Sequence, residues 1–195
     1  MSFLSHARRL SLIPFAAIVL LALAPSRSQS QMTPEMNAAK AALAKYSDPV
    51  LAIKEGYLST VACIDFPSGA KDGPVEYPPG AMGVHFINMA NVGPTLDPMK
   101  PQVLLYEQVG GKLVLTGAEW FMPVAASGGK APAIFGQTLA GPMDGHEPIM
   151  PAELKHYDLH VWFWKDNPKG MFTSTNAGVK CNPTDAYTVQ VGHQH

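Results

Sequence analysis

Arginine is missing from almost all of this 195-residue chain, because its only three copies lie within residues 1–28. Beyond residue 28 the chain carries 11 Lys against 15 Asp and Glu, a net charge of −4, and no lysine cluster replaces the missing guanidinium groups. Arginine is the side chain best suited to bidentate binding of phosphate and carboxylate. The composition therefore argues against nucleic acid as a partner and against phosphoryl-transfer substrates.

Long apolar runs are also missing. The longest run, residues 10–24, is shorter than the roughly 18–20 residues that cross a bilayer. Two arginines precede it and small residues follow it, which is the pattern of a secretory signal peptide. We therefore expect residues 1–28 to be a signal peptide cleaved between Ala24 and Ser28, and the protein to be secreted or periplasmic with no stable membrane anchor after cleavage. A retained anchor is the alternative.

Cysteine is scarce, with only Cys63 and Cys181 present. Cysteines of an exported chain usually pair, so we expect a disulfide between the end of the first helical region and the C-terminal segment. A metal site containing both cysteines is the alternative, but the pair lacks the C-x-x-C spacing that structural zinc sites favour. No serine lies in a G-x-S-x-G elbow, so a nucleophilic serine finds no support either.

Residues 29–195 are long enough, and apolar enough, to bury one ordinary core, so we predict a single domain. Thr33 and Pro34 are typical of a helix start. Apolar residues then recur every three or four positions, with one interruption, which predicts helices at residues 34–46 and 49–55.

Four later apolar segments predict β-strands at residues 83–88, 103–107, 113–122 and 156–164. The second and third flank Gly110 and Gly111, a hairpin signal. Segments rich in Pro and Gly predict long loops at residues 65–81, 91–101 and 123–155, and residues 182–195 are predicted to be a mobile tail. The expected fold is α+β: an N-terminal helical pair packed on a mainly antiparallel sheet with long loops.

The segment at residues 156–164 has the densest set of titratable side chains. Alternation places His156, Asp158, His160, Trp162 and Trp164 on one face, opposite Tyr157, Leu159, Val161 and Phe163. Because neither face is wholly polar, we predict that this strand lies inside the sheet and is covered on both sides. His156 and His160 would be about 13 Å apart at about 3.3 Å per residue, too far to share one ion.

Other predicted strands each place a titratable group among apolar neighbours, including His85, Glu107 and Glu119. If these strands are adjacent, His85 and Glu119 converge on His160, and His146 can reach them from the long loop. Two or three histidines with one carboxylate suit a divalent metal such as zinc or copper, or iron.

The predicted ligand-binding and metal-binding residues are therefore His85, Glu119, His146 and His160, with Glu147 as an alternative carboxylate. We expect a secreted protein that binds a small molecule or a metal ion in this pocket. One alternative is a hydrolase-like enzyme, metal-dependent or with His160 or Glu119 as general base. The other is a structural domain whose histidines hydrogen-bond to Glu107 or Glu119 and bind nothing.

Five motifs carry a resemblance that covers most of the chain from the first helix to the second cysteine. They are Met82-Gly83-Val84-His85-Phe86, Leu105-Tyr106-Glu107, Glu119-Trp120-Phe121, Gly145-His146-Glu147-Pro148 and His156-Tyr157-Asp158-Leu159-His160-Val161-Trp162. In these motifs the chain is similar to a group of exported bacterial proteins with no assigned reaction. The resemblance implies an exported bacterial domain and supplies no catalytic residues.

Overall fold

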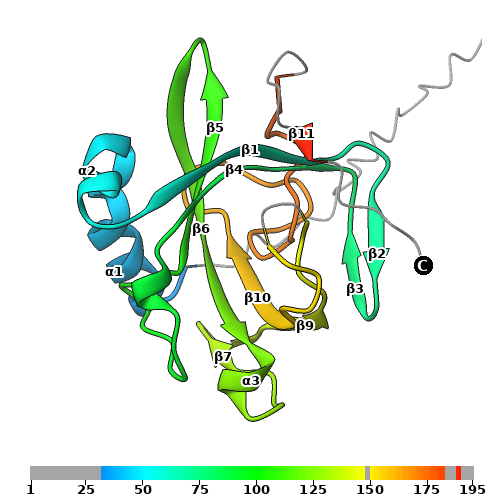
Figure 1. The fold of residues 1–195 in the computed structure, drawn as a ribbon. Coiled ribbons are helices and arrows are strands. Elements are labelled where there is room, and N and C mark those ends of the chain that lie inside the picture. The colour runs from blue at the N-terminus through cyan, green and yellow to red at the C-terminus, as the bar shows by residue number, and fades with distance from the viewer. Residues whose placement is uncertain (1–31, 148–149, 183–187, 190–195) are drawn as a thin grey trace, which may run out of the picture.

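A computed structural model describes residues 32–147, 150–182 and 188–189 of the protein (Figure 1). Its centre is a seven-stranded sheet with the strand order β11-β1-β4-β5-β6-β10-β9. All neighbouring strands in this sheet are antiparallel except β11, which lies parallel to β1. The predicted mainly antiparallel sheet is thus confirmed. The predicted signal peptide lies outside the described residues, as does most of the predicted tail.

The strands of the large sheet are β1 Leu58–Phe66, β4 Gly80–Ile87, β5 Val103–Val109, β6 Lys112–Pro123, β9 Ala140–Met143, β10 His156–Val161 and β11 Thr188–Val189. Two small hairpins are formed by β2 Ala70–Asp72 with β3 Val75–Tyr77, and by β7 Ala133–Ile134 with β8 Gln137–Thr138. The helical segments are α1 Pro34–Leu43, the 3-10 turn η1 Ala44–Ser47, α2 Pro49–Lys54, the 3-10 turn η2 Met89–Asn91 and α3 Val124–Ser127.

Helices α1 and α2 each begin at a residue whose side chain caps the first turn. Thr33 Oγ1 accepts a hydrogen bond from the backbone N–H of Met36 at 3.2 Å, and Asp48 Oδ1 accepts one from Val50 at 2.9 Å. A proline follows each cap, where its missing N–H costs nothing. The first helix differs from the prediction, since it tightens to a 3-10 turn after Leu43.

The hairpin of β5 and β6 confirms the clearest strand prediction. Val109 pairs with Lys112 across Gly110 and Gly111, whose φ angles of 57° and 76° suit the two-residue turns that join antiparallel strands. The predicted position of the histidine-rich strand is also confirmed. β10 lies between β6 and β9, and all six of its residues are buried.

Other predictions were wrong. The predicted loop at residues 65–81 contains β2 and β3, and the one at 123–155 contains β7, β8 and β9. These strands have two to four residues each, too few for a recognisable alternation. Strand β1 was missed because its first half is largely exposed and its register shifts twice against β4.

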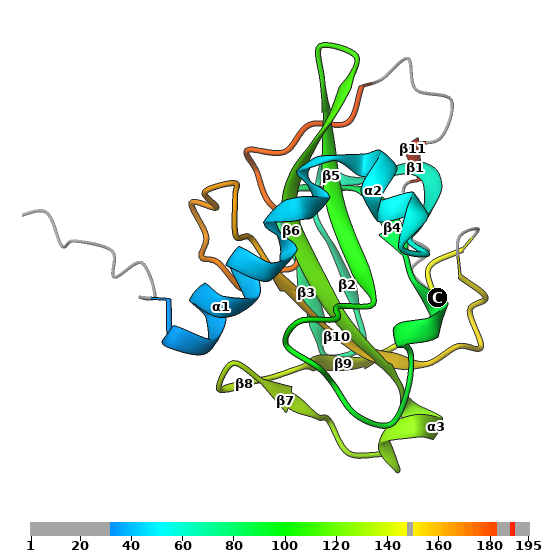
Figure 2. The same ribbon diagram turned by 90° about the vertical axis from the view of Figure 1, so that its left-hand side faces the viewer.

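The large sheet has two unlike faces. One face contributes Leu104, Ala118 and Trp120 to a core cluster that also contains Met36 and Leu43 of α1. The other face carries the titratable side chains of β10. Figures 1 and 2 place α1 and α2 on one side of the sheet and the β2–β3 hairpin on the other. The polar face is therefore covered by chain as well, and its charged groups are removed from water.

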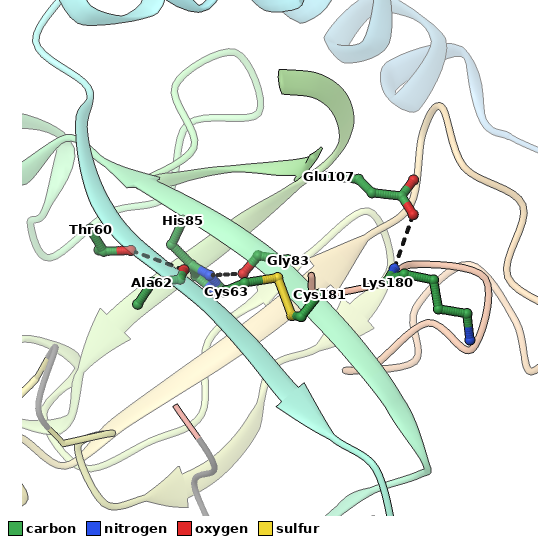
Figure 3. Close-up of a disulfide and its surroundings, with 8 residues drawn as sticks. All are labelled: Thr60, Ala62, Cys63, Gly83, His85, Glu107, Lys180 and Cys181. Atoms are coloured by element: carbon green, nitrogen blue, oxygen red, sulfur yellow. Dashed lines mark hydrogen bonds between the residues drawn. A yellow bond between two sulfur atoms is a disulfide. The ribbon is translucent and has the colours of Figure 1, made fainter. Parts of the chain in front are cut away.

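The predicted disulfide is present. Cys63 and Cys181 are bonded across 118 residues of sequence, beside Gly83 and His85 (Figure 3). Glu107 anchors the same segment, since its carboxylate accepts hydrogen bonds from Lys180 N–H at 3.0 Å and Lys165 Nζ at 2.8 Å. The suggested pairing of a histidine with Glu107 is wrong for this reason.

In the described part of the chain, none of the helices is long and apolar enough to cross a bilayer.

Candidate metal centre

Three of the four predicted site residues meet on the polar face of the sheet. His85 of β4, Glu119 of β6 and His160 of β10 each offer a ligand atom, and these atoms all lie within 4.8 Å of one another. Glu119 is the direct cross-strand partner of His160. All three side chains are buried, with exposed fractions of 5%, 4% and 2%. Strand pairing therefore gathers groups that are up to 75 positions apart in the sequence.

The separations between the carboxylate and each histidine of this group suit ligands of one metal ion. Glu119 Oε2 lies 3.4 Å from His85 Nε2 and 3.6 Å from His160 Nε2. The contact with His85 is a long hydrogen bond that helps to lower the pKa of Glu119, whereas the distance to His160 exceeds hydrogen-bond range. Two ligand atoms bound tetrahedrally at about 2.0–2.1 Å lie about 3.3–3.4 Å apart. The ring centres of the two histidines are 6.2 Å apart, wider than the roughly 5.2–5.5 Å of two imidazoles at tetrahedral angles, so the two rings would have to move closer together to bind one ion tetrahedrally.

His85 has its second ring nitrogen fixed by the backbone. Its Nδ1 lies 3.2 Å from the carbonyl oxygen of Gly83, to which it donates (Figure 3). In a neutral imidazole this bond leaves the Nε2 lone pair facing the carboxylate of Glu119. A lone pair and a carboxylate repel each other unless a proton or a metal ion lies between them. Histidines that bind metals are commonly oriented by such an outer hydrogen bond.

His160 is the least satisfied polar side chain of the site. Neither of its ring nitrogens has a hydrogen-bond partner within the described structure. Its Nδ1 lies 4.0 Å from Asp158 Oδ1, which is too far for a hydrogen bond. Leaving a buried donor or acceptor unpaired costs about 1–3 kcal/mol, so such a group in a native interior calls for an explanation.

Burial sets the charge states of the site. It lowers the pKa of His160 to about 4, so the imidazole is neutral at pH 7. Burial alone would raise the pKa of Glu119, but the neighbouring His160 and His85 outweigh it and lower that pKa below its usual range. Burial and the charge of Glu119 raise the pKa of Asp158. A neutral imidazole and an ionised carboxylate, as His160 and Glu119 present them, are the states in which such groups bind metals.

His146, the fourth predicted residue, lies outside this group of three. Its Nε2 is 3.3 Å from Tyr77 Oη, and its ring centre is 5.4 Å from that of His156. It is buried, and burial lowers its pKa to about 4. Glu147, the alternative carboxylate, is exposed.

Sequence reasoning did not include His156, Asp158, Tyr77 and Met143 among the site residues. The alternating pattern of β10 already placed His156 and Asp158 on the face of His160, so that signal was available. Tyr77 and Met143 fall in segments predicted as loops, and no pattern in the sequence indicated that they would cover this face.

Three protein ligands leave at least one coordination position of a four-coordinate ion for water or substrate, as in catalytic rather than structural zinc sites.

A scan against protein-family models found no match, and searches of curated proteins and of solved structures found no similar protein. The geometry of the site is therefore the basis for the function of this protein, and the resemblance to exported bacterial proteins stays a prediction.

Proposed function

We propose that the protein is an exported metal-binding protein that holds one divalent ion through His85, Glu119 and His160. The observation that carries this proposal is the unpartnered, buried imidazole of His160 beside an ionised carboxylate. A metal ion would satisfy His160, lie between His85 Nε2 and Glu119, and compensate the buried charge of Glu119. Two nitrogens, each at a near-tetrahedral separation from one carboxylate oxygen, favour zinc, with copper and iron as the alternatives.

The structural alternative has less support. If the polar groups served only to hold the core together, each would be expected to find a partner within the protein. Glu107 behaves in this way, with two hydrogen bonds from the segment that leads to Cys181. His160 does not, since both of its nitrogens are unpaired in the described structure.

A metal-dependent, hydrolase-like enzyme is the second candidate function. The open coordination position supports it, because a metal held by three protein ligands can lower the pKa of a bound water and present it as a nucleophile. In this reading Glu119 and His160 bind the metal and neither acts as the general base.

The setting of the site completes the proposal. The Cys63–Cys181 disulfide supports an oxidising compartment, in line with the signal peptide expected at residues 1–28. We further propose that the N-terminal helices act as a packed pair on the apolar face of the sheet. They would hold that face rigid while the opposite face binds the ion.

The test is metal content. Untagged protein, produced with its own N-terminal segment, is stripped with a chelator, reloaded with Zn²⁺, desalted and analysed by mass spectrometry of metals. We expect one equivalent of zinc in the wild type and less than about 0.1 equivalent in His160→Gln. The control is H193A/H195A, which removes the two terminal histidines as an adventitious site and should keep the full equivalent. Equal zinc in wild type and H160Q would overturn the proposal.

A further inference from the structure

A second group of metal-binding side chains lies on the same sheet face, on the other side of Asp158. Met143 of β9 is the direct cross-strand partner of His156 on β10, so their side chains project from the same face of the sheet. His146 follows β9 and brings its ring centre to 5.4 Å from that of His156. All three side chains are buried, with exposed fractions of 1%, 6% and 1% for Met143, His146 and His156.

Each histidine of this group has one nitrogen in an identified contact and a second nitrogen that could bind a metal. His156 Nδ1 donates to the carbonyl oxygen of Leu154 at 3.1 Å, so Nε2 is its candidate ligand atom. Asp158 Oδ2 lies 4.0 Å from that Nε2, beyond hydrogen-bond range. His146 uses Nε2 for its contact with Tyr77, so Nδ1 is its candidate ligand atom. Histidines in metal sites show this division between an outer hydrogen bond and a free ligand atom.

Met143 places its sulfur among polar atoms, although it is otherwise a core residue. Its Sδ lies 2.9 Å from Tyr77 Oη, and the same hydroxyl is 3.3 Å from His146 Nε2. Burial raises the pKa of Tyr77, so the hydroxyl keeps its proton and cannot serve as an anionic ligand. The hydroxyl donates its proton to Met143 Sδ and can accept the Nε2–H of His146, which would leave a lone pair on His146 Nδ1.

The environment of the group is apolar. Met143 and Tyr77 pack in a cluster with Phe66 and Ile64, and the ring centre of Phe121 lies 4.9 Å from the ring centre of His156. A hard divalent ion would need a carboxylate here, and Asp158, whose carboxyl lies 4.0 Å from His156 Nε2, forms no group of three such ligands with the two histidines. The described residues contain only one group of three acidic, histidine or cysteine ligands within 4.8 Å, and it is the one at His160. A thioether with two neutral imidazoles instead suits a soft monovalent ion, for which charge compensation matters less.

We propose that Met143, His146 and His156 form a second metal site, selective for a soft monovalent cation such as Cu(I). The separation of the two imidazoles fits such an ion, since rings bound at about 2.0 Å with angles near 110–120° have centres roughly 5.2–5.5 Å apart. This site is distinct from the His85–Glu119–His160 group in position and in ligand type. It does not depend on whether that group is occupied.

The experiment titrates zinc-loaded, untagged full-length protein with Cu(I) under anaerobic conditions, against a chromophoric Cu(I) chelator. We expect one equivalent of Cu(I) to bind without release of zinc. The variant Met143→Leu keeps the size and apolar character of the side chain and should weaken Cu(I) binding more than about tenfold. Met36→Leu is the matched control, because Met36 is equally buried but lies in α1 on the opposite face of the sheet, and it should leave Cu(I) binding unchanged.

X-ray absorption at the copper edge gives a second measurement that does not depend on affinity. The wild type should show a sulfur neighbour to copper that is absent from M143L. E119Q separates this site from the first, since it should retain the Cu(I) equivalent even where zinc no longer binds. The inference is overturned if copper has no sulfur neighbour, if M143L binds Cu(I) as tightly as the wild type, or if Cu(I) displaces zinc from a single shared equivalent.

Discussion

His160 and Glu119 face each other directly across β10 and β6, with Nε2 3.6 Å from Oε2 and both side chains buried. This distance is too long for a hydrogen bond and close to the separation of two ligands on one tetrahedral ion. Holding complementary groups just short of contact in a buried interior costs free energy unless a third group joins them. The pair is therefore better explained as half of a metal coordination sphere than as an ion pair.

Replacing Glu119 with glutamine should abolish zinc binding while leaving the fold intact. The amide is nearly isosteric with the carboxylate but lacks the charge that offsets the ion. Since outer hydrogen-bond partners of metal ligands are already worth about 10–100-fold in affinity, loss of a direct ligand should weaken binding more than about 100-fold. Competition with a chromophoric zinc chelator measures the affinity.

Glu107→Gln is the matched control for that measurement. Glu107 is also a buried carboxylate of the sheet, but its partners are Lys165 and the backbone N–H of Lys180. The variant should lower the free energy of unfolding and leave the zinc affinity within about twofold of the wild type. Equal losses of affinity in E107Q and E119Q would show that the effect is a general weakening of the sheet.

The sequence predicted those parts of the fold in which periodicity and turn chemistry agree. The β5–β6 hairpin followed from Gly110-Gly111, and the interior position of β10 followed from its two covered faces. Strands β2, β3 and β7–β9 could not be predicted, because they are short and flanked by Pro and Gly. Their pairing is decided by tertiary contacts.

The sequence indicated which types of residue form the candidate site better than it indicated which particular residues lie together in it. His85, Glu119 and His160 were expected to converge because each lies among apolar neighbours on a strand. Strand order was the missing information, since only the sheet places β4, β6 and β10 so that these side chains meet. His146 was assigned to the same pocket, and the structure instead places it with Tyr77 and His156.

Gly83→Ala should disturb both the fold and the metal site. Gly83 has a φ of +86°, and an added Cβ would lie 2.3 Å from the carbonyl oxygen of Tyr106. Its own carbonyl accepts the hydrogen bond that orients His85. We expect the variant to lose roughly 3 kcal/mol or more of unfolding free energy, measured with denaturant, and roughly tenfold of zinc affinity.

Gly110→Ala is the control for Gly83→Ala, because it measures how much stability is lost through the backbone conformation alone. Gly110 also has a positive φ, 57°, but nothing lies within 4 Å of an added Cβ. This variant should lose only about 1–2 kcal/mol, the cost of a left-handed residue, with no change in zinc affinity. If the two alanine variants lost equal stability, the close approach of Gly83 to Tyr106 would have no energetic importance.

Removing the disulfide should destabilise the protein and loosen the strand that carries His85. Cys63 pairs with Val84, the residue before His85, and the bond closes a loop of 118 residues. Chain entropy alone predicts a loss of about 4–5 kcal/mol for the C63A/C181A variant, a large share of the typical 5–15 kcal/mol for a domain. Denaturant unfolding of oxidised, reduced and variant protein measures this. A loss below about 1 kcal/mol in both reduced and variant protein would contradict the prediction.

Stability of the metal-free protein should fall as the pH drops from about 6.5 towards 4. Burial lowers the pKa of His146 to about 4, from 6.5 for an ordinary histidine. Between these values the unfolded chain binds a proton that the folded chain excludes, so the stabilisation is complete above pH 6.5 and is lost as pH falls through that window. One such histidine gives a slope of up to about 1.4 kcal/mol per pH unit. Unfolding free energies of wild type and His146→Gln, measured with chelator from pH 4.5 to 7, test this. The variant should show the shallower slope, and identical slopes would exclude His146 as a source of the pH dependence.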